Sequence, residues 1–307
     1  MFIGLDVGGS FVKGALVEAE GRVVGRFREP VAKGSVEAFL GQMEAAVRQL
    51  DGSGRAAAVG IGLPGIVDRS TWRVRVSPAV PILNGLPIGE EVARRTGRPC
   101  VLENDGNAAA LSEAWIGAGR GADTLLLVTL GTGVGAGLVV GGRVWSGRSG
   151  YAGEIGHVQV DEGGLPCPCG SRGCLETIAG APGWTRRARA LLASRDSSLR
   201  EESLDPEAIV AAARSGDAVA LEVVDGAARA LGAGIAAALD LLNLDRVVLA
   251  GGVAAAGSFL LDRIVEQTRR RTYPHVFSDC SFRLAELGAD AGALGAARAA
   301  MTEAGRV

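Results

Sequence analysis

The sequence lacks an apolar stretch of the roughly 18 residues that a membrane span needs, so we expect no transmembrane helix. It also lacks a basic leader, because the chain runs from Met1 straight to Asp6 and two glycines, and we expect no signal peptide. Positive charge is not in surplus: 32 Lys and Arg face 34 Asp and Glu, a formal net charge of −2. This balance gives no support for nucleic-acid or anionic-membrane partners. We therefore expect a cytoplasmic protein with neither partner.

Histidine and cysteine are scarce, with two and five residues, yet four of these seven lie close together. His157, Cys167, Cys169 and Cys174 form a ligand set suited to a closed, four-coordinate structural zinc site. Pro168 and the glycines among the thiols predict a turn-rich loop able to wrap an ion. Two alternatives are a cluster of merely buried thiols and a disulfide, which suits a protein without a secretion signal poorly.

Two glutamates accompany the predicted zinc ligands. Glu154 precedes His157 by three residues, and Glu176 follows Cys174 by two. A filled zinc site has no need of these carboxylates, but it would hold them in place. We interpret the segment as a scaffold for a polar ligand.

Glycine is in excess, with 47 residues, about twice its usual share of roughly 7%. The glycines follow apolar runs in short bursts, and one plan of strand, glycine-rich turn with a hydroxyl, and second strand occurs twice. The copies run through Phe2–Val7, Gly8–Ser10 and Val12–Val17, and through Thr124–Leu130, Gly131–Gly137 and Leu138–Val140. Exposed amides in such turns can approach a phosphate, although each hairpin alone could be purely structural. The repetition favours a nucleotide clamped between duplicated lobes, with Gly251 and Gly252 forming a third glycine-rich strand end.

Strands and helices alternate along the remaining chain, which predicts an α/β fold. Further strands are expected over 57–63, 99–102, 245–250 and 281–285, and helices over 35–50, 89–96, 107–115, 181–193, 205–214, 218–242, 259–271 and 291–301. Gly65 lies in a sharp turn after one strand, and Asn84 lies in a proline-rich, non-helical segment, Ser77–Pro87.

Polar residues follow the strand at Pro99–Leu102. Glu103, Asn104 and Asp105 lie at its carboxyl end, which is where open α/β sheets bind ligands. The alternative is that Asp105 only caps the next helix. Asn104 could form the same cap, so the pair exceeds what a cap requires.

Five motifs together closely resemble the ROK family of bacterial sugar kinases and related repressors. They are D-V-G-G-S at Asp6–Ser10, E-N-D at Glu103–Asp105, G-T-G-V-G-A-G at Gly131–Gly137, G-E-I-G-H at Gly153–His157, and C-P-C-G-S-R-G-C-L-E at Cys167–Glu176. The resemblance implies the α/β actin-like ATPase (ribonuclease H-like) fold, with two lobes and a cleft between them. We expect a small N-terminal lobe of residues 1–112 plus 291–307, and a large C-terminal lobe of 113–290 that carries the zinc segment.

The resemblance also implies roles for individual residues. Asp105 would be the general base and Asp6 would help to place Mg²⁺ with ATP, while zinc would be structural. The sugar contacts would be Gly65, Asn84, Asn104, Asp105, Glu154, His157 and Glu176. The ATP contacts would be Asp6, Gly8, Gly9, Ser10, Lys13, Thr132, Gly133, Gly135, Gly251 and Gly252. Ser10 departs from the usual threonine but keeps the hydroxyl.

The expected activity is ATP-dependent phosphorylation of the 6-hydroxyl of a hexose, with glucose as the leading substrate. Fructose, N-acetylmannosamine, N-acetylglucosamine and allose are alternatives, and polyphosphate is a less favoured donor. A sugar-sensing repressor would carry a helix-turn-helix domain, for which the chain leaves no room before Asp6. A catalytically inactive sugar-binding protein is disfavoured because Asp105 and both turns are intact. The resemblance implies a homodimer or a homotetramer.

Overall fold

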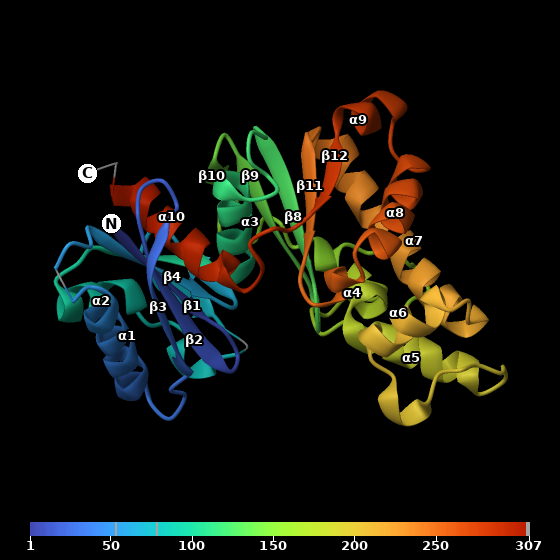
Figure 1. Cartoon of the computed structure of the whole chain (residues 1–307), viewed down its shortest axis with the longest axis horizontal. Coiled ribbons are helices and arrows are strands. Elements are labelled where there is room, and N and C mark those ends of the chain that lie inside the picture. Colours follow the sequence, from blue (N-terminus) through green and yellow to red (C-terminus); the bar gives the residue numbers. More distant parts are fainter. Residues whose placement is uncertain (53, 78, 305–307) are drawn as a thin grey trace. The chain divides into compact units, whose positions relative to one another are not determined.

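A computed structural model describes residues 1–52, 54–77 and 79–304, and it contains two five-stranded sheets (Figure 1). The first sheet has the order β3-β2-β1-β4-β7. Its strands are β1 (Phe2–Val7), β2 (Phe11–Val17), β3 (Val23–Pro30), β4 (Ala58–Leu63) and β7 (Cys100–Asn104). β1, β2 and β3 pair antiparallel, whereas β4 runs parallel to both β1 and β7.

The second sheet has the order β10-β9-β8-β11-β12. Its strands are β8 (Thr124–Leu130), β9 (Val134–Val140), β10 (Arg143–Val144), β11 (Arg246–Ala250) and β12 (Ser281–Leu284). β11 runs parallel to both β8 and β12. In each sheet the first strand along the chain is central, its hairpin partners lie on one side and two later strands lie on the other. The predicted duplication is confirmed at the level of sheet order.

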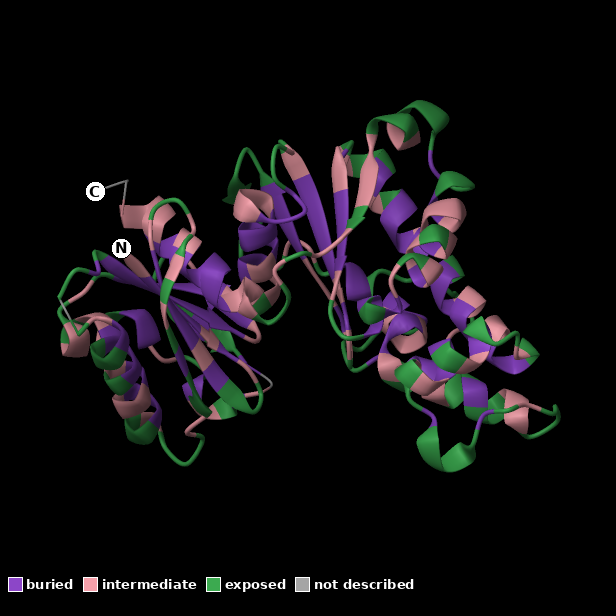
Figure 2. Cartoon of the chain, in the orientation of Figure 1, coloured by how far each residue is buried: buried purple, intermediate pink, exposed green. Residues whose placement is uncertain are grey.

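Two helices cover one face of the first sheet and two cover the other. The helices are α1 (Val36–Leu50), α2 (Ile88–Thr96), α3 (Asp105–Ile116) and α10 (Ala291–Ala304). Side chains of α1 and α2 join one apolar core with Ile3, Leu5 and Ile61, while α10 and α3 pack with Ala15, Ala58 and Val101. This sandwich is why the central strands are buried in Figure 2.

Helix α10 lies very close to the first sheet and to α3. A Cβ atom on Gly4 or on Gly60 would lie 1.8 Å from a backbone oxygen of α10, and one on Gly295 would lie 1.7 Å from Ala108 O. Any side chain at these three positions would force the elements apart. The small residues of 291–304 therefore set how closely the last helix packs.

Six α-helices lie between the second hairpin and α10: α4 (Leu175–Ala179), α5 (Ala181–Leu192), α6 (Pro206–Arg214), α7 (Ala218–Leu242), α8 (Ser258–Arg269) and α9 (Pro274–Asp279). The long, alanine-rich α7 contacts α4, α5, α6 and α8, and α8 contacts β12. Asp217 caps the start of α7 by accepting a hydrogen bond from Ala220 N at 2.9 Å.

The described chain divides into two compact units. Unit 1 holds Met1–Asp123, Gly137–Ala152 and the chain from Glu286 onward, and unit 2 holds Thr124–Ala136 and Gly153–Ala285. The lobes expected from the sequence, 1–112 plus 291–307 and 113–290, have different boundaries, and residues 305–307 lie outside the described residues. No helix among the described residues is long and apolar enough to cross a membrane.

Several short elements were not predicted. β3, β10 and the hairpin of β5 (Ile66–Asp68) and β6 (Arg73–Val76) were missed, and the segment Ser77–Pro87 contains one 3₁₀ turn at Pro81–Leu83. β9 begins at Val134, four residues earlier than expected, because Gly135 and Gly137 belong to the strand. A Cβ on Gly135 would lie 2.7 Å from Thr129 Oγ1, so this glycine allows close packing rather than a turn.

Candidate functional site

Asp6 and the first glycine turn lie together in unit 1. Asp6 is half-buried near the end of β1, opposite Lys13 on β2. Burial raises the pKa of Asp6 to about 6, with the positive charge of Lys13 opposing the shift and the negative charge of Asp105 adding to it. The turn closes through Gly8 N, which donates to Phe11 O at 2.9 Å, and Gly9 has no neighbouring atom within 4 Å of a Cβ position. The backbone of Gly9 is therefore open to close approach by a ligand.

Asn104 and Asp105 form the junction between β7 and α3. Asn104 is the N-cap: its Oδ1 accepts from Asn107 N at 3.0 Å. Its Nδ2 donates to Asp105 Oδ1 at 3.1 Å, and Gly106 N donates to the same oxygen at 2.9 Å. Asp105 is thus the first residue of the helix and not its cap. Its carboxyl group is solvent-exposed, but surrounding protein atoms partly desolvate it and raise its pKa.

Gly65 and Asn84 lie near this junction. Gly65 has φ +116° and its carbonyl accepts from Asn104 Nδ2 at 2.9 Å. A Cβ on Gly65 would lie 2.1 Å from Val76 O, so only glycine fits. Asn84 Oδ1 accepts from the N–H of Ser77, the residue after Val76, at 2.7 Å. The structure therefore brings four of the predicted sugar contacts into one part of unit 1: Gly65, Asn84, Asn104 and Asp105.

The second glycine turn spans Gly131–Gly133 in the structure and lies in unit 2, beside the glycines that follow β11. Gly131 N donates to Gly133 O at 3.0 Å, and Thr132 lies between them. Gly251 has φ +91°, and a Cβ there would lie 2.3 Å from Leu130 O. The two predicted ATP-binding segments of unit 2 are therefore adjacent.

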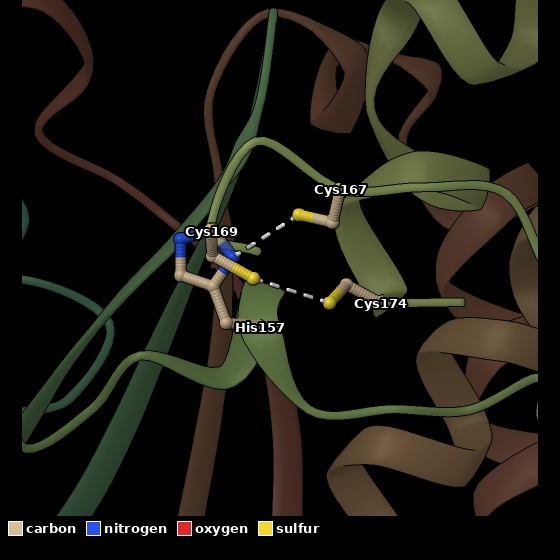
Figure 3. Close-up of side chains that lie close together, drawn as sticks. All are labelled: His157, Cys167, Cys169 and Cys174. Carbon is tan, nitrogen blue, oxygen red and sulfur yellow. Dashed lines mark hydrogen bonds between the residues drawn. The ribbon is translucent and has the colours of Figure 1, made fainter. Parts of the chain in front are cut away.

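The four predicted zinc ligands converge in unit 2 (Figure 3). Their ligand atoms, on His157, Cys167, Cys169 and Cys174, all lie within 4.8 Å of one another. Cys167 Sγ is 3.6 Å from His157 Nδ1, and Cys169 Sγ is 3.6 Å from Cys174 Sγ. A tetrahedral zinc ion with Zn–S bonds of about 2.3 Å needs sulfurs about 3.8 Å apart, so the donor set and its spacing fit the ion.

The loop between the ligands is held by its backbone. Cys167 N donates to Ser171 O, Gly173 N donates to Leu165 O, and Gly173 has φ +63° with no room for a Cβ beside Asp161 O. Burial raises the pKa of the Cys174 thiol to about 12. Zinc would have to displace this proton on binding, as it does at structural thiolate sites.

The two accompanying glutamates face different partners. Glu154 Oε2 lies 3.9 Å from His157 Nε2, the ring nitrogen that is not directed at the thiols. Glu176 lies on α4, and its Oε2 accepts from Val134 N at 3.1 Å. A Cβ on Gly156 would lie 2.1 Å from Val134 O. The zinc segment and the second glycine turn are therefore in direct contact.

A sequence model of the ROK family matches residues 2–303. The chain belongs to the ROK family.

Relatives of known name or structure cover almost the whole of this ROK protein. The glucokinase of Halalkalibacterium halodurans is 37% identical, over 96% of this chain and 93% of that protein. The ROK hexokinase from Thermus thermophilus has a TM-score of 0.88 and 34% identity, covering 100% of this chain and 99% of its own. The ROK glucokinase from Streptomyces griseus, solved with glucose and AMPPNP, has a TM-score of 0.80 and 34% identity, covering 98% and 99%. The predicted family and the α/β actin-like ATPase fold are confirmed.

Two residues of this ROK protein bear on the site but were given no role among the predicted site residues. A Cβ on Gly292 would lie 2.5 Å from Asp6 Cγ, so a glycine in α10 leaves space for that carboxylate. Glu103 is 2% exposed and accepts a hydrogen bond from the backbone N–H of Asn104 at 3.0 Å. The sequence held one signal for Gly292, since glycine inside a helix costs about 1 kcal/mol relative to alanine and invites a packing explanation.

Proposed function

We propose that this ROK protein is an ATP-dependent hexose kinase that phosphorylates the 6-hydroxyl of glucose. The observation that carries the proposal is the exposed Asp105 carboxylate, which Asn104 and Gly106 orient at the carboxyl end of β7. The glucokinase and hexokinase relatives along nearly the whole chain support the same activity and the same acceptor.

In the proposed reaction the sugar hydroxyl oxygen attacks the γ-phosphorus, and the bond between that phosphorus and the leaving oxygen of ADP breaks. The hydroxyl proton passes to Asp105. Because Oδ1 already accepts two hydrogen bonds, Oδ2 is the atom oriented for the proton. Phosphoryl transfer depends mainly on positioning and charge neutralisation, so one well-placed carboxylate suffices as the base.

The remaining site residues position the substrates. The glycine-rich segments Gly8–Ser10 and Gly131–Gly137 would cradle the ATP phosphates, with Gly251 and Gly252 near the nucleoside. Lys13, in register with Asp6, and Thr132 would add polar contacts to ATP. Asp6 would help to place Mg²⁺, which neutralises phosphate charge when bound.

The proposed sugar contacts are assigned to each unit separately. Gly65, Asn84 and Asn104 belong to unit 1, and Glu154, His157 and Glu176 to unit 2. Zinc on the Nδ1 side of His157 would fix the ring and leave Nε2 for a sugar hydroxyl.

The test of the proposal is a coupled ADP-release assay with ATP and Mg²⁺. It compares glucose with fructose, mannose, allose, N-acetylglucosamine and N-acetylmannosamine, and it includes polyphosphate as an alternative donor. We expect turnover to be greatest on glucose with ATP. No turnover on any sugar, with glucose binding still detectable by calorimetry, would contradict the kinase and favour a sugar sensor.

Replacement of the proposed base gives a second test. Asp105→Asn should lower kcat by about 10²-fold to 10⁴-fold, the usual contribution of general base catalysis. Calorimetry should still detect glucose binding, because the amide retains an acceptor oxygen. Wild-type kcat in this variant would contradict the assignment of the base.

Three further proposals concern the whole molecule. We propose that the functional lobes are 1–112 with 291–307 and 113–290, that the protein acts in the cytoplasm, and that it forms a homodimer or a homotetramer. Light scattering of the purified protein at several concentrations tests the last of these.

A further inference from the structure

We propose that Glu103 is a positioning residue for Asp105, acting through Asn104. The proposal rests on the proposed function, in which Asp105 takes the hydroxyl proton. Glu103 is the residue of β7 that precedes this junction, and its side chain is 2% exposed. A carboxylate at such a depth is rare unless it is paired, so its partners indicate its purpose.

Strand geometry directs Glu103 away from the core that α1 and α2 cover. Cys100 and Leu102 belong to that core, whereas Val101 packs with Leu111, Ala299 and Ala300 on the other face. Since side chains alternate along a strand, Glu103 shares the face of Val101. It is thereby directed toward α3 and α10.

One oxygen of Glu103 holds the start of α3. Oε1 accepts from the backbone N–H of Asn104 at 3.0 Å and from Asn107 Nδ2 at 3.1 Å. These bonds fix the peptide that leads into Asn104 and the residue whose N–H the Asn104 side chain caps. The backbone of Asn104 and the residue that its side chain caps therefore both depend on one buried carboxylate.

The other oxygen of Glu103 ties the junction to the rest of unit 1. Oε2 lies 3.1 Å from Arg69 Nη1, and Arg69 Nη2 lies 3.3 Å from Glu303 Oε1 on α10. Arg69 follows β5, in the same connection that contains Gly65 and the hairpin beside it. Oε2 accepts no hydrogen bond in the described structure, so the charge of Arg69, and not a directed hydrogen bond, attracts this carboxylate toward the last helix.

The chain of contacts ends at the proposed base. With Asn104 held, its Nδ2 is directed at both Gly65 O and Asp105 Oδ1. If Glu103 is lost, the Asn104 peptide and its side-chain amide gain freedom, and Asp105 loses one of the two donors that orient Oδ1. Misplacement of a reacting group by about 1 Å can cost about 10²-fold in rate.

The test compares Glu103→Ala with Glu103→Gln in the ADP-release assay, at a temperature well below the unfolding midpoint of each variant. Glu103→Ala should lower kcat by about 10²-fold and leave the KM for ATP near the wild-type value. Glu103→Gln keeps an acceptor for Asn104 N, so it should restore kcat to within about fivefold of wild type. Folded Glu103→Ala with wild-type kcat would overturn the proposal.

Glu113, in the last turn of α3, supplies a matched control for Glu103 on β7. It is also a buried glutamate, 0% exposed, and it accepts from Ala118 N, Glu286 N and Leu287 N. Glu113 lies in the last turn of α3, whereas Asn104 caps the first turn of that helix. Glu113→Ala should lower the unfolding midpoint but keep kcat at low temperature, and an equal loss of kcat in both alanine variants would overturn the specific role of Glu103.

A double-mutant cycle separates positioning from a general structural effect. If Glu103 acts through Asp105, then adding Glu103→Ala to Asp105→Asn should lower kcat by less than about threefold more. The same large loss in both backgrounds would overturn the proposal. Wild-type kcat in Asp105→Asn alone would instead contradict the proposed function. Should Glu103→Ala fail to fold, Glu103→Asp replaces it, because a carboxylate one methylene shorter cannot reach both Asn104 N and Arg69; unchanged kcat there would overturn the proposal.

Discussion

Glu176 on α4 accepts a hydrogen bond from the backbone N–H of Val134, the first residue of β9. A Cβ on Gly133 would lie 2.2 Å from the same Glu176 oxygen. One carboxylate next to the zinc ligands therefore also supports the turn expected to hold phosphate.

This contact predicts that two substitutions of Glu176 will differ. Glu176→Ala should raise the KM for both sugar and ATP, because the sugar contact and the support of Val134 N are both lost. Glu176→Gln keeps an acceptor for Val134 N, so its KM for ATP should stay within about twofold of wild type while its KM for sugar rises. Steady-state kinetics measure both constants, with the exposed Glu162→Ala as control. Equal rises in the KM for ATP in the two Glu176 variants would contradict the contact.

Gly292→Ala should impair the use of Mg²⁺. The new Cβ would lie 2.5 Å from Asp6 Cγ and 2.7 Å from both carboxylate oxygens, so Asp6 must move. We expect the Mg²⁺ concentration for half-maximal activity to rise about tenfold, in line with the cost of misplacing a contact group. Gly41→Ala in α1 is the matched control, because that position has no atom within 4 Å of a Cβ and should gain up to about 1 kcal/mol of stability. An unchanged Mg²⁺ requirement in Gly292→Ala would show that Asp6 tolerates displacement.

Asp6 should make the free energy of unfolding fall as pH rises. Its pKa is about 6 in the folded protein against a usual 3.8, so between these values the folded state binds more protons than the unfolded state. Stabilisation by protonated Asp6 is thus full below about pH 4 and lost as pH rises through about 6. Asp6→Asn cannot lose a proton, so its free energy of unfolding should not show this fall. Its free energy of unfolding relative to wild type should therefore rise by about 2 to 3 kcal/mol as pH increases between those two values.

Urea unfolding of both proteins across this pH range, without Mg²⁺, measures the difference. Lys13 and Asp105 are the charged groups that act on Asp6 in the structure, and both stay in place in the variant. Asp196→Asn, an exposed change of the same kind, controls for the loss of one charge. A constant difference between Asp6→Asn and wild type at every pH would contradict the raised pKa.

Removal of zinc should affect the KM for sugar more than the KM for ATP. His157 joins the thiols through Nδ1 and approaches Glu154 through Nε2, so loss of the ion releases the ring that the sugar is expected to contact. Cys169→Ser should lower the zinc content measured by elemental analysis and raise the KM for sugar about tenfold or more, as for other losses of metal-site support. Cys280→Ser, outside the cluster, should change neither quantity. Full sugar affinity in zinc-free protein would refute the coupling.

Much of the secondary structure follows from local pattern. Apolar spacing predicted α1 with its Ser35 cap, and it predicted the full length of α7. β3 was missed because charged residues interrupt its sequence, so it does not form an apolar run; most of its residues are exposed or only partly buried. β9 was started too late because glycine usually indicates a turn, whereas here it accommodates neighbouring side chains.

The sequence by itself determined the zinc ligand set, both glycine turns and the Asn104–Asp105 pair, because each depends on residue types close together in the chain. Tertiary structure alone decided that Gly292 leaves room for Asp6, that Arg69 and Glu303 hold Glu103, and that Glu176 supports Val134. These contacts join residues that are far apart in sequence, and no local pattern of polarity or spacing encodes which of them meet. Packing of α10 on the first sheet, and of the zinc segment on the second turn, brings them together.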